Sequence, residues 1–370
     1  MTSPPLRADH VGSLLRPASL LSARADRAAG RISPEELRSI EDAAIREVVA
    51  AQHSIGLSSA TDGEFRRTSW HMDFIYRLGG ISASDESIKV KFRNAAGGLE
   101  FTSAALRVDG PIRLTETVFA DDFAFLRDVA GDAVTPKLTI PSPSMVHYRG
   151  GPAALDPAVY PDEELFWADL SQAYAQQVAA VAELGCRYLQ LDDTSLAYLN
   201  DPDQRAQLTA RGDDAEHQHL RYIRQINTAL AGRPDSLRVT THMCRGNFRS
   251  SWAAEGGYDF VAEALFSELA VDGFFLEYDD PRSGSFAPLR FVPPGKQVVL
   301  GLVTTKRGEL ESKDELKRRI DEAAKYVPLD QLCLSPQCGF SSTVEGNALT
   351  HDEQFAKLAL IVEVAQEVWG

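Results

Sequence analysis

The chain has 370 residues, 44% of them hydrophobic and 25% charged, and its formal net charge is −15. This hydrophobic content is typical of a globular protein with a full core. The acidic balance argues against nucleic acid or an anionic membrane as a partner, because both attract basic surfaces.

Targeting signals and cysteine content indicate the compartment. No apolar stretch approaches the ~20 residues that a membrane-spanning helix needs, and the N-terminal sequence MTSPPLRADHVGS lacks the features of a signal peptide. The chain contains four cysteines, which is too few for a disulfide framework in a protein of this length. We therefore expect a cytoplasmic protein without a membrane partner. The sequence does not determine the oligomeric state, and a homo-oligomer is among the open alternatives.

Short apolar runs that end in polar residues predict eight β-strands. In chain order they lie at residues 7–13, 57–63, 135–141, 187–193, 238–244, 272–278, 297–303 and 331–337. Helical patterns fall between most of them, at residues 34–55, 163–185, 204–232, 252–269, 312–326 and 351–369. From residue 187 onward a strand followed by a helix recurs every 25–50 residues, which indicates parallel strands with crossover helices.

Eight such units predict an α/β fold of the (β/α)8 TIM-barrel class, in a single domain spanning residues 1–370. Two helix starts are marked by capping signals: Ser33 before Pro34, and Thr350 followed by Glu353. Residues 80–134 are too long for a simple connection, and their alternating VKFRN and ALRVDG segments predict a hairpin over the barrel mouth. The connection after the second strand is thus elaborated.

Three strand ends in the C-terminal half offer metal ligands. His242 and Cys244 are two residues apart in an extended segment, so their side chains point to the same side. Glu277 ends the next strand, and Cys338 lies in the Pro-Gln-Cys-Gly turn after the last one. Barrel active sites are built at the carboxyl ends of the strands, where all four residues fall. Two thiolates, an imidazole and a carboxylate suit tetrahedral zinc better than magnesium or calcium.

The assignment has alternatives at the level of single residues. Asp279 and Asp280 directly follow Glu277 and could supply the fourth ligand instead. Cys186 and Cys333 lie in apolar surroundings, and we interpret both as core residues. His71 falls near a predicted loop at the barrel mouth, where a substrate contact and a packing role are both open.

The ligand set also suggests the chemistry. A zinc ion that already has two thiolate ligands and a carboxylate is electron-rich, and therefore a weak Lewis acid for making hydroxide. It is better suited to hold a substrate thiol as thiolate. A free thiol with a pKa near ~8.5 is mostly protonated at neutral pH, so binding to zinc increases the amount of nucleophile. We therefore expect transfer of an electrophilic carbon to a thiol.

These residues resemble the catalytic C-terminal half of cobalamin-independent methionine synthases, and in particular its stand-alone, single-barrel members. The resemblance covers nearly the whole chain and implies a (β/α)8 barrel that binds Zn²⁺ through His242, Cys244, Glu277 and Cys338. Val11, Gly12 and Ser13 resemble the loop that touches the amino-acid group of homocysteine. Glu64 and Asp192 resemble two acids that bind its ammonium group. The implied partners are a small thiol, such as homocysteine, and an alkyl donor.

Some positions depart from this family pattern. The family's leaving-group histidine appears here as Lys306, an acid that contacts the folate pterin as Tyr198, and a folate-packing tryptophan is missing from PSPSMVHYRG. We assign Lys306 as a catalytic cation that steers an anionic donor or stabilises an alkoxide, and we expect a donor other than methyltetrahydrofolate. A related branch, which joins coenzyme M to epoxides, is an alternative, as is a structural zinc in a non-catalytic protein.

Overall fold

Seven parallel strands form a curled sheet at the centre of the molecule. The computed structural model describes residues 4–94 and 97–370, apart from the side chains of residues 85–89 and 101–104. The spatial order of the strands is β1, β4, β5, β6, β7, β8, β9. Their bounds are β1 (Ser59–Ala60), β4 (Thr135–Pro141), β5 (Tyr188–Asp193), β6 (Arg238–Met243), β7 (Gly273–Glu277), β8 (Gln297–Val303) and β9 (Leu332–Pro336).

The N-terminal segment closes this sheet into a barrel. The Asp9 N–H donates to the Leu334 carbonyl of β9 at 3.0 Å, and the Leu14 N–H donates to the Gly63 carbonyl just after β1 at 3.1 Å. Residues 7–14 thus occupy the eighth place of a (β/α)8 barrel, as predicted. The strand predicted at 7–13 is nevertheless wrong, because the segment makes one isolated bridge, between Ala8 and Leu334. It turns inward at Gly12, whose φ of +144° lies outside the extended range.

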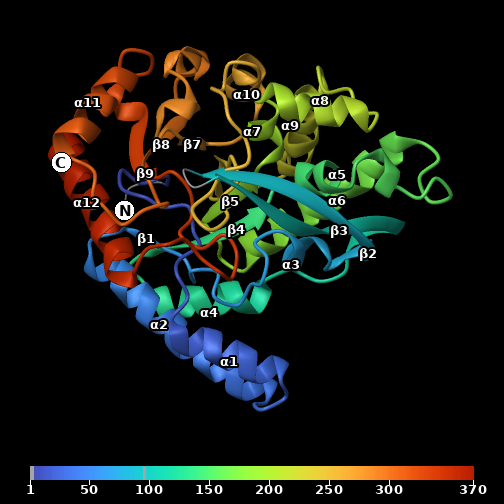
Figure 1. Cartoon of the computed structure of the whole chain (residues 1–370), viewed down its shortest axis with the longest axis horizontal. Coiled ribbons are helices and arrows are strands. Elements are labelled where there is room, and N and C mark those ends of the chain that lie inside the picture. Colours follow the sequence, from blue (N-terminus) through green and yellow to red (C-terminus); the bar gives the residue numbers. More distant parts are fainter. Residues whose placement is uncertain (1–3, 95–96) are drawn as a thin grey trace.

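Helices surround the strands (Figure 1). Within the described residues they are α1 (Ala18–Ala28), α2 (Pro34–Ser54), α3 (Met72–Ile75), α4 (Ala120–Ala130), α5 (Ser144–Gly150), α6 (Glu163–Glu183), α7 (Ser195–Tyr198), α8 (Pro202–Ala210), α9 (Gln218–Leu230), α10 (Ala262–Glu268), α11 (Lys313–Ala323) and α12 (His351–Trp369). The capping boxes predicted before α2 and α12 are both present. The helices predicted at residues 312–326 and 351–369 are confirmed as α11 and α12.

Two predicted helices are shorter than expected. The pattern at residues 204–232 is split into α8 and α9, because Gly212 has a φ of +100° and ends the first helix. The pattern at residues 252–269 forms a helix only from Ala262, and Gly256 with φ +108° lies in the preceding loop. That loop instead turns back toward β6, where the Ala254 N–H donates to the Arg245 carbonyl.

The predicted hairpin over the barrel mouth is confirmed. Strands β2 (Leu78–Asn94) and β3 (Gly97–Leu114) pair antiparallel and cross the barrel in Figure 1. Near the tip, Arg93 forms an antiparallel bridge with Trp252 in the loop after β6, through backbone hydrogen bonds of 2.7 and 2.9 Å. This bridge ties the hairpin to the loop that follows a metal-ligand strand.

Buried polar groups inside the barrel fix the N-terminal segment. Asp9 accepts hydrogen bonds from the Tyr188 hydroxyl at 2.7 Å and the Ser59 hydroxyl at 3.0 Å. The Lys137 ammonium donates to the His10 carbonyl at 2.6 Å and lies 4.1 Å from the centre of the Phe275 ring. The loop that follows, from Val11 to Ser13, is therefore held on a rigid base at the barrel mouth.

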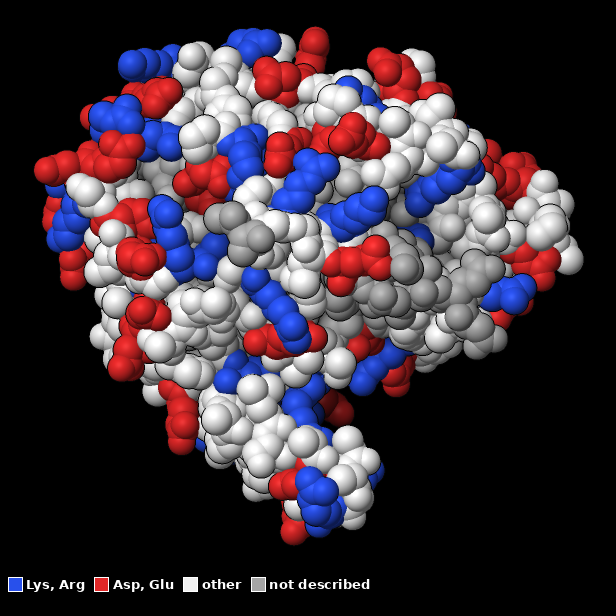
Figure 2. Space-filling view, viewed as in Figure 1, with Lys and Arg blue, Asp and Glu red and all other residues white. Residues whose placement is uncertain are grey.

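The surface carries charges of both signs. On the face shown in Figure 2, lysine and arginine side chains are interspersed with aspartate and glutamate. Within the described part of the chain, no helix combines the length and apolar character required to cross a membrane.

Candidate metal centre and substrate cavity

Four side chains with metal-ligating atoms converge at the carboxyl ends of the strands. His242 lies on β6 with Cys244 just beyond it, Glu277 ends β7, and Cys338 follows β9. Their ligand atoms all lie within 4.8 Å of one another, and all four residues are buried. The two sulfurs are 3.5 Å apart, and His242 Nε2 is 4.0 Å from Glu277 Oε1. The structure thus brings together all four residues that the sequence predicts as ligands.

Neighbouring groups orient these side chains. His242 Nδ1 lies 3.4 Å from Asp192 Oδ1, while Nε2 lies 3.2 Å from the Gln337 carbonyl oxygen and 4.0 Å from Glu277 Oε1. The backbone N–H of Arg245 donates to Glu277 Oε1 at 3.0 Å, and the Gly246 N–H donates to the Cys244 sulfur at 3.3 Å. Carboxylate partners of this kind fix the tautomer of a ligating histidine.

Burial and mutual repulsion perturb the acidity of the cluster. Burial and the neighbouring Cys338 raise the pKa of Glu277 to about 7. The hydrogen bond between the two thiols, with burial, raises the pKa of Cys244 well above its ordinary value, while that bond and His242 lower the pKa of Cys338 well below it. Burial would lower the pKa of His242, but Asp192 and Cys338 raise it to about 10. Four buried groups that compete for protons in this way are what a divalent cation stabilises.

The donor set fits zinc. Two thiolates bound at ~2.3 Å in tetrahedral geometry are ~3.8 Å apart, close to the 3.5 Å between Cys244 and Cys338 Sγ. Sulfur, imidazole nitrogen and carboxylate oxygen together favour zinc over the hard cations magnesium and calcium. His242, Cys244, Glu277 and Cys338 are the residues that would hold it.

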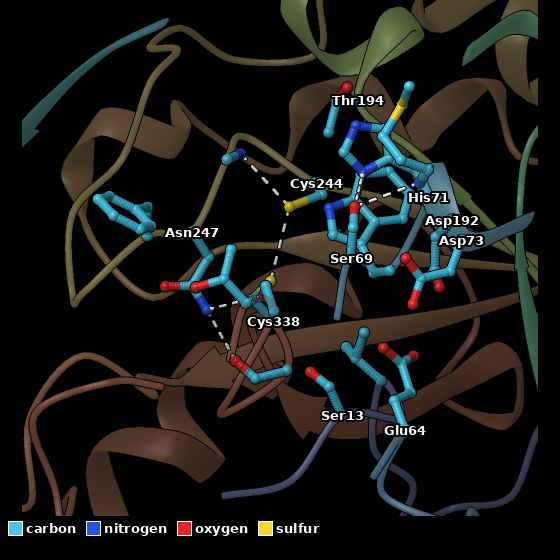
Figure 3. Close-up of a pocket in the computed structure, with 18 of the residues that line it drawn as sticks. Ser13, Glu64, Ser69, His71, Asp73, Asp192, Thr194, Cys244, Asn247 and Cys338 are labelled. Atoms are coloured by element: carbon cyan, nitrogen blue, oxygen red, sulfur yellow. Dashed lines mark hydrogen bonds between the residues drawn. The ribbon is translucent and has the colours of Figure 1, made fainter. Parts of the chain in front are cut away.

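A cavity of about 380 Å³ opens directly above the cluster. The cluster's His242, Cys244 and Cys338 form part of its wall. Figure 3 shows the two cysteines facing each other, with the carboxylates of Glu64 and Asp192 on the other side of the space. Pockets of this size hold small molecules. The cavity therefore joins a candidate metal centre to a small-molecule site.

The two predicted ammonium-binding acids both line this cavity. Glu64 is buried, with a left-handed φ of +60°, and its Oε1 accepts from the Thr139 hydroxyl at 2.7 Å. Arg67 lies 3.5 Å from the same oxygen. Burial raises the pKa of Glu64, Arg67 lowers it, and Asp192 raises it further. Two neighbouring carboxylates repel each other, so a cationic ligand group between them would be stabilising.

The predicted Val11 to Ser13 loop also reaches the cavity, through Val11 and Ser13. Gly12 does not line the cavity but permits the turn, because a Cβ there would lie 2.7 Å from Thr139 Cγ2. Across the cavity mouth, the Phe340 N–H donates to the Ser13 carbonyl at 2.9 Å. The loop is thus hydrogen-bonded to the turn that carries Cys338.

Lys306, which the sequence predicts as a catalytic cation, lies outside the lining of the cavity. Its ammonium donates to Asp279 at 2.8 Å. Burial would raise the pKa of Asp279, but Lys306 lowers it. Asp280, the other alternative ligand, is bound to Arg282. Glu277 is therefore the carboxylate that joins the cluster.

Several cavity residues were not assigned to the site from the sequence, although for His71 a substrate contact was one of two open roles. Trp70, His71, Phe92 and Arg149 all line the space, and none of them ends a strand of the barrel. Phe92 belongs to the hairpin. The predicted position of this hairpin over the barrel mouth was the one sequence feature that could have placed Phe92 in the cavity wall. Tyr198, at the position where the resemblance implies a pterin-binding acid, also lines the cavity.

The geometry defines a parallel α/β barrel with a His-Cys-Glu-Cys cluster at the carboxyl ends of its strands. The family model described as the cobalamin-independent synthase catalytic domain matches residues 8–367. The chain belongs to this family of methionine synthase-like methyltransferases.

Individual relatives match this chain over nearly its whole length. The uncharacterized protein YxjH of Bacillus subtilis is 49% identical over 366 residues, covering 99% of this chain and 95% of that protein. The methionine synthase of Pyrococcus abyssi is 24% identical over 349 residues, covering 92% and 87%.

Solved structures agree with the fold. A putative vitamin-B12 independent methionine synthase from Listeria monocytogenes has a TM-score of 0.79 and 38% identity, covering 100% of both chains. A B12-independent methionine synthase from Shewanella sp. W3-18-1, in complex with selenomethionine, has a TM-score of 0.72 and 21% identity, covering 98% and 97%. The second likeness bears on the fold alone.

Proposed function

We propose that this protein is a zinc-dependent methyltransferase that transfers a methyl group to the thiol of homocysteine, giving methionine. The observation that carries the proposal is the convergence of four metal-ligating atoms within 4.8 Å in the wall of a small-molecule cavity. A purely structural zinc would have no need of such a cavity.

Zinc in this cluster would keep the substrate thiol deprotonated at neutral pH, which makes it a nucleophile. The chain's own residues then position the rest of the substrate. Glu64 and Asp192 bind the ammonium group, since two facing carboxylates in a buried cavity favour a cation. The loop of Val11 and Ser13 borders the carboxylate end. Asp192 also holds His242 in place, so substrate binding and ligand geometry share one residue.

The relatives support the choice of thiol. The Pyrococcus abyssi relative is named a methionine synthase. The two acids opposite the cysteines also fit homocysteine, which carries an ammonium group, better than they fit coenzyme M. Coenzyme M carries a sulfonate in place of an amino acid and would be repelled by two carboxylates.

The test is metal and thiol binding in matched cysteine variants. The purified protein should carry about one zinc per chain, and Cys244→Ser or Cys338→Ser should lose it while remaining folded, since a core of this size does not need a metal for stability. Cys186→Ser is the control, because that buried thiol lies outside the cluster and donates to the Tyr188 carbonyl at 3.4 Å. Full zinc retention in both ligand variants would contradict the ligand assignment.

The thiol is tested by counting protons. Homocysteine binding should release about one proton as the thiol becomes thiolate, measured by calorimetry in buffers of different ionisation enthalpy. Tighter binding of coenzyme M than of homocysteine would contradict the choice of thiol. Binding without proton release would favour a structural metal instead.

A further inference from the structure

Arg149 is an unpaired cation in the cavity wall. Among the described residues that line the cavity it is the only lysine or arginine, alongside the acids Glu64, Asp73, Asp192 and Glu345. Within the described part of the chain, its guanidinium makes no hydrogen bond and no ion pair, and its Nε atom is buried without a partner. The residue is only partly exposed, so its charge is incompletely solvated, and an anion is the partner that a guanidinium normally takes. An unpaired one facing a ligand cavity indicates that an anionic group of the ligand completes it.

His71 offers a second unpaired donor to the same space. The residue is 5% exposed, and its Nε2 is buried without a hydrogen-bond partner. The Ser69 hydroxyl, which accepts the Met72 N–H at 3.2 Å, lies 3.1 Å from His71 Nδ1. Since Nδ1 is the available acceptor for the Ser69 proton, the ring's own proton is assigned to Nε2. Nε2–H is then a donor without a partner, on a side chain that lines the cavity.

Burial and the charge of Arg149 lower the pKa of His71 well below its ordinary value of 6.5. The imidazole is therefore neutral, and it donates one hydrogen bond rather than a proton. Arg149 and His71 together form a recognition pair for a carboxylate or another small oxyanion.

This pair is distinct from the residues that are assigned to the thiol substrate. Arg149 is on α5, after β4, and also borders a neighbouring cavity together with Val90 of the hairpin and Tyr198. The proposed contacts to homocysteine come instead from Glu64, Asp192 and the N-terminal loop. The anionic group recognised by Arg149 therefore belongs to the second reactant, the methyl donor.

The cavity also restricts the leaving group. A methyl group leaves an amine readily only when a proton reaches the nitrogen, and neither of the described basic side chains His71 and Lys306 supplies one. His71 is neutral, and Lys306 is outside the cavity and paired with Asp279. A sulfonium leaves as a neutral thioether and needs no proton. Aromatic rings of Trp70 and Phe92 line the space and could face such a cation.

The volume of the cavity also favours a small donor. Its volume of about 380 Å³ is near the low end of the range for pockets that hold a single drug-sized ligand. Two reactants must share it during methyl transfer, so the part of the donor that lies beside the thiol must be small.

We propose that the methyl donor is a small methylsulfonium compound with a carboxylate tail, whose carboxylate binds Arg149 and His71 Nε2–H. In the reaction, the thiolate sulfur forms a bond to the methyl carbon. The bond from that carbon to the sulfonium sulfur breaks, and its electron pair stays on the departing sulfur, which leaves as a neutral thioether. This inference rests on the proposed function, because it requires a thiolate acceptor.

The first test measures binding without turnover. Zinc-loaded full-length protein saturated with homocysteine is titrated by calorimetry with 3-(methylthio)propionate, the thioether product of such a donor, and with its uncharged amide. The carboxylate should bind about tenfold more tightly or better, as expected for charge-assisted hydrogen bonds. Arg149→Met should abolish this preference, and Arg149→Lys should keep part of it. Arg93→Met is the matched control, because Arg93 borders only the neighbouring cavity.

The second test measures turnover. Methionine formation from homocysteine should proceed with dimethylsulfoniopropionate and fall at least tenfold with ethyldimethylsulfonium, which lacks the carboxylate. Equal binding of the carboxylate and the amide, or equal turnover of both sulfonium compounds, would overturn the proposal. So would an Arg149-dependent preference for coenzyme M over homocysteine. Proton release on homocysteine binding separates the two hypotheses: if it persists while sulfonium compounds are inert, the donor assignment fails and the thiol assignment stands.

Discussion

Replacing Glu64 by glutamine isolates the contact between the protein and the substrate ammonium. The substitution preserves shape and removes one buried negative charge. Glutamine can keep the hydrogen bond from Thr139, which is 2.7 Å long. Arg67 keeps a second partner in the Thr139 carbonyl at 2.8 Å, so it is not left unpaired. The loss should therefore fall on the ligand rather than on the fold.

The magnitude follows from the kind of bond that is lost. A hydrogen bond to a charged group contributes about 1.5–3 kcal/mol, which corresponds to roughly 10- to 150-fold weaker binding of homocysteine. The analogue 4-mercaptobutyrate has the same thiol and carboxylate but no ammonium group. Its affinity for Glu64→Gln should stay within about threefold of its affinity for the wild-type protein, since the contact that changes is absent.

The assay is calorimetric titration of both thiols into both zinc-loaded proteins. Homocysteine affinity for the wild-type protein should also rise with pH in the acidic range. Burial and Asp192 raise the pKa of Glu64 above its ordinary value of 4.5, and the ionised form binds the ammonium. This pH dependence should weaken in Glu64→Gln. Equal losses for homocysteine and 4-mercaptobutyrate would refute the reasoning, because they would mean that Glu64 supports the cavity rather than the ammonium.

Three further predictions concern the metal, the loop and the buried ion pair. Zinc affinity should fall as the pH is lowered through about 7, because a protonated Glu277 cannot ligate and burial with Cys338 raises its pKa to about 7. Competition with a chelator at a series of pH values measures this affinity. Constant affinity between pH 8 and 6 would argue against Glu277 as a ligand. Gly339→Ala should weaken homocysteine binding by about 1–3 kcal/mol, because its Cβ would lie 1.9 Å from Ser13 Oγ; unchanged calorimetric affinity would show that the loop can shift freely. Lys306→Met should lower the free energy of unfolding by about 3–5 kcal/mol, because it leaves the buried Asp279 carboxylate without its cation. In urea titrations the double variant Lys306→Met/Asp279→Leu should recover part of that loss. Wild-type stability in Lys306→Met would contradict a structural ion pair.

The metal cluster could be predicted from sequence because its geometry is local to each strand. His242 and Cys244 share a side through the two-residue period of an extended chain, and parallel strands place their carboxyl ends at one edge. Glu277 and Cys338 needed only to end neighbouring strands. The pairing of β6 with β7, β7 with β8 and β8 with β9 provides that neighbourhood.

The donor side of the cavity could not be predicted in this way. Arg149 and His71 lie in irregular or short helical segments, and no period along the chain relates them. They are brought together by tertiary packing under a hairpin whose tip is held by the bridge between Arg93 and Trp252. Such contacts depend on how long connections fold over the barrel, which local propensity does not determine.

The predicted catalytic role of Lys306 rests on its place in the sequence order of the family resemblance. Sequence order places the lysine in a loop after β8, where the resemblance implies a residue acting on the leaving group. In the structure its ammonium is bound to Asp279, and among the charges acting on the pKa of Glu277 it is the largest that lowers it. A fixed cation there favours the ionised carboxylate that a metal needs. The proposed sulfonium donor needs no acid for its leaving group, which agrees with a lysine that acts on Glu277 instead.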